Sequence, residues 1–120
     1  MNRPKMVQPG KGFHPALRRA LDDEVEYLDE DAFDIRWKPI PGETFLEIDR
    51  ERRTLWLNKR YRLLLTGDAY GSLNDAPLLK GLLYLLTQEV FKGSYLGPRD
   101  KDSIDLWQQI LTAAARAESQ

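Results

Sequence analysis

Apolar residues are most concentrated between positions 76 and 91, where the sequence reads A-P-L-L-K-G-L-L-Y-L-L-T-Q-E-V-F. On a helix these positions cover more than one stripe, and a helix that is apolar most of the way round is normally buried. Asn74 or Asp75 can cap such a helix, Pro77 suits its first turn, and Gly93 ends it. The pattern predicts a helix that is either the core of a small domain or the seam with a partner.

Two other segments repeat apolar residues every three or four positions, which is typical of amphipathic helices. The first covers 15–31, and the second runs from a cap at Asp102 or Ser103 to about residue 117. Their stripes are Leu17, Leu21, Val25, Leu28 and Ala32 in the first, and Ile104, Trp107, Ile110, Leu111 and Ala114 in the second. Together with the β segment described next, they supply enough apolar surface to cover much of the 76–91 helix, which favours the core interpretation.

A β-hairpin is predicted from two short segments in which apolar and polar residues alternate, 44–49 and 54–58. The alternating apolar residues are Leu46 and Ile48 in the first segment and Leu55 and Leu57 in the second. A polar turn over 49–52 joins them, and 35–37 is a candidate third strand. Because a lone hairpin is not stable in water, it must pack on a helix.

The predicted fold class is α+β, with an N-terminal amphipathic helix, a small antiparallel hairpin or three-stranded sheet, and two packed C-terminal helices. A short helical turn is expected over 59–65, and loops over 66–75 and 92–101. Residues 1–12 are rich in Pro, Gly and Lys without periodicity and are expected to form a flexible basic arm that orders only on a partner. Residues 13–118 then form one domain, as their number suggests.

Charge is segregated along the chain although the formal net charge is only −1. Residues 1–20 hold five basic residues and no acids, residues 21–34 hold eight acids and no bases, and residues 35–62 hold eight bases and four acids. In the 15–31 helix the acids lie late and Arg18 and Arg19 early, which is unfavourable for the helix dipole. The acidic block is therefore expected to face either the basic segment that follows or, less favoured, an external partner.

No set of residues typical of a catalytic or metal site can be assembled from the sequence. His14 is the only histidine and precedes a proline at a helix start, so a cap or surface role is preferred over catalysis. The acids at 22–30 are expected to be solvated rather than to bind metal, because metal sites draw ligands from several elements. The segment 66–72 lacks the G-K-[ST] ending of a phosphate loop. We predict a protein that is not an enzyme, without cofactor, metal or small-molecule substrate.

The sequence also bears on where the protein acts. There are no cysteines and no hydrophobic signal region at the start, which fits a reducing cytoplasm. The 76–91 run is too short, and too interrupted by polar residues, to span a bilayer. We expect a cytoplasmic protein with no membrane partner.

Basic residues at 50–62 are the best candidates for nucleic-acid contact. They are Arg50, Arg52, Arg53, Lys59, Arg60 and Arg62, and Trp56 and Tyr61 lie among them. Clustered cations bind phosphates, and an aromatic ring can stack on an unpaired base. The sequence pI of about 5.8 argues against a dedicated nucleic-acid module, since such modules are usually basic. Nucleic-acid binding through this patch and the arm is therefore the alternative hypothesis.

The chain also resembles a known family. The segments 45–49 and 54–58, the leucine-rich helix after Asn74-Asp75-Ala76-Pro77, and the alanine-rich 104–118 segment are similar to the C-terminal portion of bacterial GHKL-superfamily ATP-binding proteins, several associated with antiphage defence. In those relatives a histidine-proline-aromatic element commonly follows the leucine-asparagine, whereas Lys59-Arg60-Tyr61-Arg62 follows Asn58 here. The nucleotide-binding motifs of the family are absent, so the resemblance implies a distal domain for dimerisation or partner binding, not ATP binding.

The leading hypothesis is thus a protein-interaction or oligomerisation module, a subunit or distal domain of a bacterial complex for antiphage defence or DNA processing. A protein partner or a homo-oligomer is expected. Leftover apolar surface for that partner is predicted at Tyr84, Phe91 and Trp107.

Overall fold

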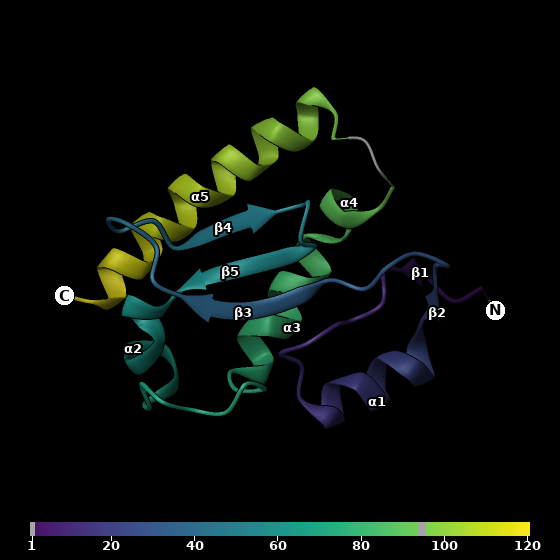
Figure 1. Ribbon diagram of the computed structural model, residues 1–120, viewed down its shortest axis with the longest axis horizontal. Coiled ribbons are helices and arrows are strands. Elements are labelled where there is room, and N and C mark those ends of the chain that lie inside the picture. Colours follow the sequence, from purple (N-terminus) through teal and green to yellow (C-terminus); the bar gives the residue numbers. More distant parts are fainter. Residues whose placement is uncertain (1, 94–95) are drawn as a thin grey trace.

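A three-stranded sheet of β3 (Asp34–Lys38), β4 (Leu46–Asp49) and β5 (Thr54–Asn58) lies at the centre of the computed structural model, which describes residues 2–93 and 96–120 (Figure 1). Strands β4 and β5 pair antiparallel, with Leu46 opposite Leu57, so the predicted hairpin is confirmed. The third strand is also present, but it runs parallel to β5, which lies between β3 and β4. The sheet is therefore mixed rather than antiparallel.

The helices of the α+β fold surround this sheet. They are α1 (Pro15–Glu24), η1 (Lys59–Tyr61), α2 (Arg62–Thr66), α3 (Pro77–Leu86), α4 (Gln88–Phe91) and α5 (Pro98–Glu118), and a second, two-stranded sheet pairs β1 (Lys5–Met6) with β2 (Glu26–Tyr27). Helix α3 passes behind the three-stranded sheet, α5 lies along β4, and α1 lies below β1 and β2 (Figure 1). The predicted α+β class is confirmed.

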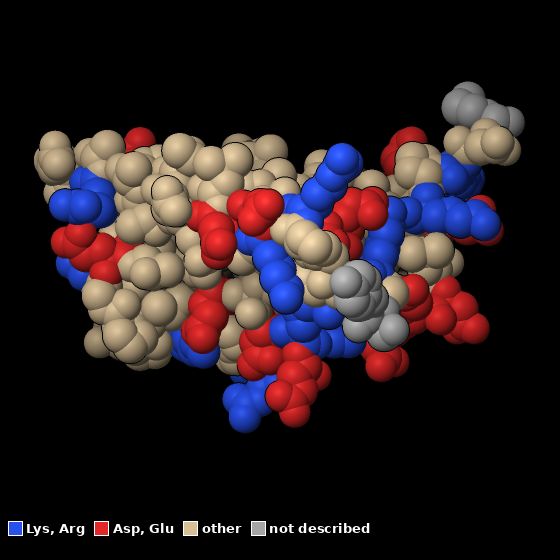
Figure 2. All heavy atoms as spheres, turned by 90° about the horizontal axis from the view of Figure 1, so that it is seen from above, with Lys and Arg blue, Asp and Glu red and all other residues tan. Residues whose placement is uncertain are grey.

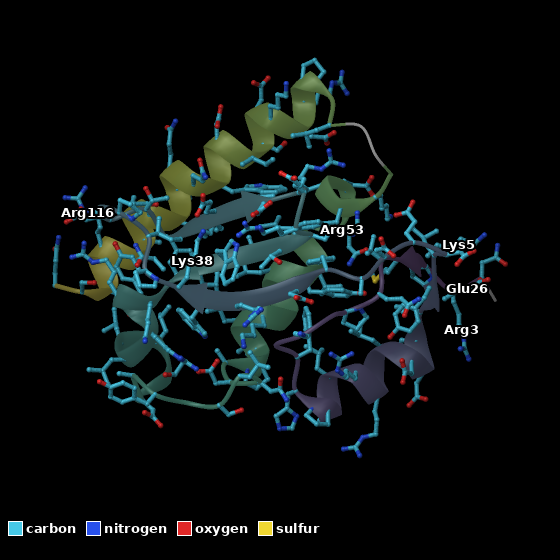
Figure 3. All side chains as sticks on the ribbon, viewed as in Figure 1. Arg3, Lys5, Glu26, Lys38, Arg53 and Arg116 are labelled. Atoms are coloured by element: carbon cyan, nitrogen blue, oxygen red, sulfur yellow. The ribbon has the colours of Figure 1, made fainter. Side chains whose placement is uncertain are left out.

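The two faces of the three-stranded sheet differ in what covers them. Strand register places Ile35 beside Leu55 on the buried face, where both side chains are fully buried. The opposite face carries Trp56, and the cationic groups of Arg36 and Lys38 lie 5.5 and 4.9 Å from the centre of its ring. None of the described helices crosses this face, on which Lys38 lies (Figure 3). Long charged side chains cover the indole there.

Helix α5 protects the free edge of β4. The amide of Phe45 donates to Oγ1 of Thr112 at 2.9 Å, and Nε2 of Gln108 donates to the carbonyl oxygen of Leu46 at 3.3 Å. An uncovered edge strand exposes backbone groups that invite pairing with other chains. These side chains satisfy part of that edge.

The N-terminal segment, expected to be a flexible arm, pairs with β2 from Lys5 and packs against the core from Met6 onward. Val7 is fully buried, its amide donates to Oε1 of Gln88 at 2.8 Å, and its carbonyl accepts from the hydroxyl of Tyr84. Farther along, the amide of Gly10 donates to the carbonyl of Phe33 at 2.7 Å. The segment owes this placement to partners 77 and 81 residues away, which composition does not reveal. Met1 lies outside the described residues.

Helix boundaries differ from the predictions where tertiary hydrogen bonds compete. Helix α1 ends at Glu24 instead of residue 31, because the chain turns into β2 and pairs in parallel with β1. The 76–91 helix is divided into α3 and α4 at Thr87. Helix α5 begins at Pro98, earlier than the expected cap, where the carboxylate of Asp100 accepts from the amide of Gly97 at 3.1 Å. The helical turn expected at 59–65 is present as η1 and α2.

Candidate protein-interaction surface

Helix α3 has two opposite faces, and only one of them is in the core. Its inner face carries Leu83 and Tyr84, which are 3% and 0% exposed. Its outer face, called here the leucine face, consists of Leu78, Leu82, Leu85 and Leu86, with exposed fractions of 77%, 59%, 55% and 45%. The core interpretation therefore holds for one side of this helix, and the other side is exposed.

The leucine face carries no charge. Between Ala76 and Gln88 the only charged residue is Lys80, and its side chain is completely buried. Large exposed apolar patches are uncommon on monomeric proteins and mark sites of protein or membrane contact. The described part of the chain has no helix with the length and apolar character needed to cross a membrane.

More exposed apolar side chains precede α3 along the chain. They are Leu63, Leu64 and Leu65 on α2, and Tyr70 and Leu73 in the loop that leads to α3. The loop is fixed to α3 because Nζ of Lys80 donates to the carbonyl oxygen of Leu73 at 2.8 Å. It is fixed to α2 because Nε of Arg62 lies 2.9 Å from Oδ2 of Asp75. This apolar set is thus attached to the N-terminal end of α3.

A buried polar cluster fixes the start of α3. The carboxylate of Asp75 accepts from Nε1 of Trp37 at 2.9 Å, from Nε of Arg62 at 2.9 Å and from Nζ of Lys80 at 3.2 Å. These donors come from β3, α2 and α3 respectively. One carboxylate therefore joins the sheet to α2 and α3, both of which carry exposed leucines.

Burial and charge shift the pKa values of this cluster. Burial tends to raise the pKa of the Asp75 carboxyl, but the hydrogen bonds from Trp37, Arg62 and Lys80 outweigh it and hold the pKa below its ordinary 3.8. Burial lowers the pKa of the Lys80 ammonium below its ordinary 10.5, and the nearby guanidinium of Arg62 lowers it further, while Asp75 acts in the opposite direction. The cluster contains two cationic groups and one anionic group.

The residue next to this cluster has an uncommon backbone conformation. Ala76 lies in the left-handed region, with φ 51° and ψ 53°, at the N-terminal boundary of α3. A residue with a Cβ pays about 1–2 kcal/mol to adopt that conformation, so surrounding contacts must hold it. The bonds of Asp75 and Lys80, one before and one after Ala76 in the chain, fix the direction in which α3 leaves the loop.

Helix α5 carries a second, narrower apolar stripe. Leu106 and Ile110 are 56% and 59% exposed, and the exposed Ala113 and Ala117 continue the stripe at steps of three and four. Uncharged side chains dominate the end of the molecule at which α5 terminates, and charged ones are more frequent toward the other end (Figure 2). The predicted stripe of α5 is corrected here, because Ile110 and Ala114 point outward.

The three residues predicted to contact a partner lie elsewhere. Tyr84 and Phe91 are fully buried, and both stack on Phe33 with ring centres 5.5 and 4.1 Å apart. Trp107 is half-buried and packs against the core. Leftover apolar surface is therefore on the opposite side of α3, because the aromatic residues fill the core and leave the leucines outside. The sequence shows that the helix has two apolar stripes, and this was the available sign of an exposed apolar face. Periodicity alone does not tell which of the two stripes faces the core.

The predicted basic patch is divided between the two ends of β5. Residues 50–53 precede this strand and residues 59–62 follow it, so roughly 17 Å of extended chain separates them. Arg53 lies beside α4, at the end of the sheet away from α2 (Figure 3). The structure does not bring these cations together into one site.

Four of the six basic residues are also engaged within the fold. Arg50 and Arg53 donate to the carbonyl oxygens of Val90 and Phe91 at 2.9 and 2.8 Å, at the end of α4. Arg60 donates to the carbonyl of Gly42 at 3.0 Å, and Arg62 belongs to the Asp75 cluster. Arg52, Lys59 and Arg60 are exposed, the first before the strand and the other two after it.

The catalytic and metal alternatives can be placed as well. Nδ1 of His14 accepts from the amide of Ala16 at 3.0 Å and caps α1. No group of three metal-ligating side chains occurs in residues 2–93 and 96–120. Of the acidic block, Glu30 accepts from the amide of Gly93 and Asp22 from the hydroxyl of Tyr27, so these carboxylates bind neutral donors instead of the basic segment.

Comparisons with protein-family models, curated proteins and solved structures give no match. The chemistry of the surface alone therefore has to indicate what this chain does.

Proposed function

We propose that this chain is a non-enzymatic protein-interaction module that binds another protein chain through the leucine face of α3. The observation that carries the proposal is the exposure of four leucines on one uncharged helix face. Burying a leucine from full exposure stabilises by about 1.5–3 kcal/mol, and each half-exposed leucine offers a corresponding part of that to a complex. The free-energy cost of removing water from this face is small, because the face carries no charged group.

The rigid base of α3 supports this assignment. Interfaces concentrate their binding energy in a central apolar cluster on a pre-organised surface, since ordering a mobile segment consumes affinity. Helix α3 is held by the bonds of Asp75 to the sheet and to α2, so its leucines need no reordering.

The resemblance to the C-terminal portion of GHKL-superfamily proteins suggests the kind of complex in which the module acts. It fits a subunit or distal domain of a bacterial complex for antiphage defence or DNA processing, acting in the cytoplasm. The alternative of nucleic-acid binding gains no support from the surface, because the six basic residues are split between two ends of a strand.

Affinity purification from the native host tests the proposal. The tagged protein is expected to retain a partner protein or tagged and untagged copies together, and Leu82→Gln is expected to abolish this. Leu106→Gln is the matched control, because Leu106 is exposed to 56% and Leu82 to 59%, but it lies on α5. Equal retention by both variants, or a strict monomer that retains nothing, contradicts the proposal.

A further inference from the structure

We infer that the leucine face binds a second copy of this chain, with α3 packed antiparallel against its counterpart around a two-fold axis at Leu82. This inference rests on the proposed function and names the partner of the same surface. A two-fold interface requires that one patch complement itself, so that each residue of a contacting pair finds the other on both copies.

The spacing of the leucines has this symmetry. Leu78 precedes Leu82 by four positions and Leu86 follows it by four, so all three lie along one side of the helix. Antiparallel packing therefore places Leu82 against Leu82 of the second copy, and Leu78 against Leu86 of the second copy. Leu85 lies beside this row and widens it.

The charges around the face also favour an identical partner. A face that meets its own copy brings like charges together, and this one has none to bring, because Lys80 is buried. The first exposed charge beyond α3 is Glu89. Antiparallel packing moves it next to the N-terminal end of the other α3, where the helix dipole favours an anion. That end also carries the cluster of Arg62, Lys80 and Asp75, with two cations and one anion.

The flanking apolar residues extend the contact to a useful size. Helix α3 is about 15 Å long, and a row of leucines on it alone is smaller than the ~800 Å² per partner that stable complexes bury. The exposed side chains of α2 and of the loop, including Leu73 and Tyr70, adjoin its N-terminal end. In an antiparallel pair these side chains lie beyond the C-terminal end of the other α3. Because of the two-fold symmetry, both copies bury this additional area.

Sedimentation of the purified protein from micromolar to millimolar concentration tests the inference. The wild type is expected to show a monomer–dimer equilibrium. Leu82→Glu places two carboxylates against each other on the axis and is expected to raise the dimer dissociation constant on the order of a hundredfold or more. Leu106→Glu carries the same change at similar exposure on α5 and is expected to leave that constant unchanged. Circular dichroism checks that each variant is folded.

Disulfide trapping tests the geometry without adding charge. The chain has no cysteine, so a single introduced thiol reports one contact. Under mild oxidation Leu82→Cys is expected to form a covalent dimer by itself. Leu78→Cys and Leu86→Cys are expected to cross-link when mixed, faster than either does alone.

Some results overturn the inference and leave the proposed function intact. A wild type that is monomeric throughout, yet binds a different protein in a manner that depends on Leu82, is one of them. A dimer that Leu106→Glu disrupts and Leu82→Glu does not would instead overturn both the inference and the proposed function. Faster trapping of Leu78→Cys alone than of the mixed pair refutes the antiparallel arrangement.

Discussion

Replacing Asp75 by asparagine is expected to destabilise the protein far more than replacing Lys80 by methionine. Asp75 is the one anion in a cluster with two cations, and it accepts hydrogen bonds from Trp37, Arg62 and Lys80. Asparagine keeps its shape, so the packing of the site changes little. It removes the negative charge and leaves a buried ammonium beside a guanidinium.

The magnitude follows from burial. The side chain of Lys80 is 0% exposed, and that of Asp75 is 11% exposed. Removing one partner of a buried ion pair typically costs about 3–5 kcal/mol, and an amide oxygen that still accepts one hydrogen bond places Asp75→Asn near the lower end. In Lys80→Met the cluster keeps Asp75 and Arg62 as a one-to-one pair. That variant loses both hydrogen bonds of Nζ, to the carbonyl of Leu73 and to Asp75, at about 1 kcal/mol each. It also removes the cost of burying an ammonium group, so a net loss of about 1 kcal/mol is expected.

Urea unfolding followed by tryptophan fluorescence measures both variants and their combination. The double variant Asp75→Asn with Lys80→Met is expected to recover part of the stability that Asp75→Asn loses, because the unpaired ammonium is gone. Equal losses for the two single variants, or an Asp75→Asn variant within ~1 kcal/mol of the wild type, would refute the assignment of one anion to two buried cations.

The same carboxylate predicts a pH dependence. The pKa of Asp75 is lower in the folded protein than its ordinary 3.8, so its contribution to the free energy of unfolding is present above that pH. It is lost as the pH falls through the folded value. Asp75→Asn is therefore expected to flatten the acid side of the stability profile, and a profile unchanged in shape would contradict this.

Three further substitutions test other parts of the fold. Burial raises the pKa of Tyr84 to about 12 from 10.0, so the free energy of unfolding is expected to fall between pH 10 and 12. Tyr84→Phe should lessen that fall in thermal melts at alkaline pH, and an unchanged dependence of stability on pH would contradict the prediction. Asn58 is 1% exposed, and its side-chain amide donates to the carbonyl oxygens of Ile40 and Thr44. Asn58→Ala should therefore lower the free energy of unfolding in urea by about 2–4 kcal/mol, whereas a loss under ~1 kcal/mol would show that water replaces the amide. Val7 is buried in the core, so Val7→Ala should lower the free energy of unfolding by about 2 kcal/mol. Gln8→Ala is the control, because Gln8 is exposed, and equal small losses for both variants would mean that the N-terminal segment does not stabilise the fold.

Features that depend on neighbouring residues could be predicted from the sequence. Alternation on Leu46, Ile48, Leu55 and Leu57 was enough for the hairpin, because its strands are joined by a short turn. The pattern of proline and leucine residues located α3. His14 was expected to be a helix cap or a surface residue, because no other residues of a catalytic set accompany it and a proline follows it at a helix start. Each of these rests on spacings of a few positions, where backbone geometry alone decides which side chains meet.

Features that depend on distant partners were decided only in the tertiary structure. Strand β3 joins the sheet in parallel, and Val7 enters the core through Tyr84 and Gln88, far along the chain. The orientation of α3 is the clearest case. Both of its sides are rich in leucine, so hydropathy leaves its rotation undetermined, and a lysine would by itself be expected to face water. Lys80 faces inward because Asp75 is held there by Trp37 and Arg62, and this inward lysine leaves the leucines on the opposite, exposed side of the helix.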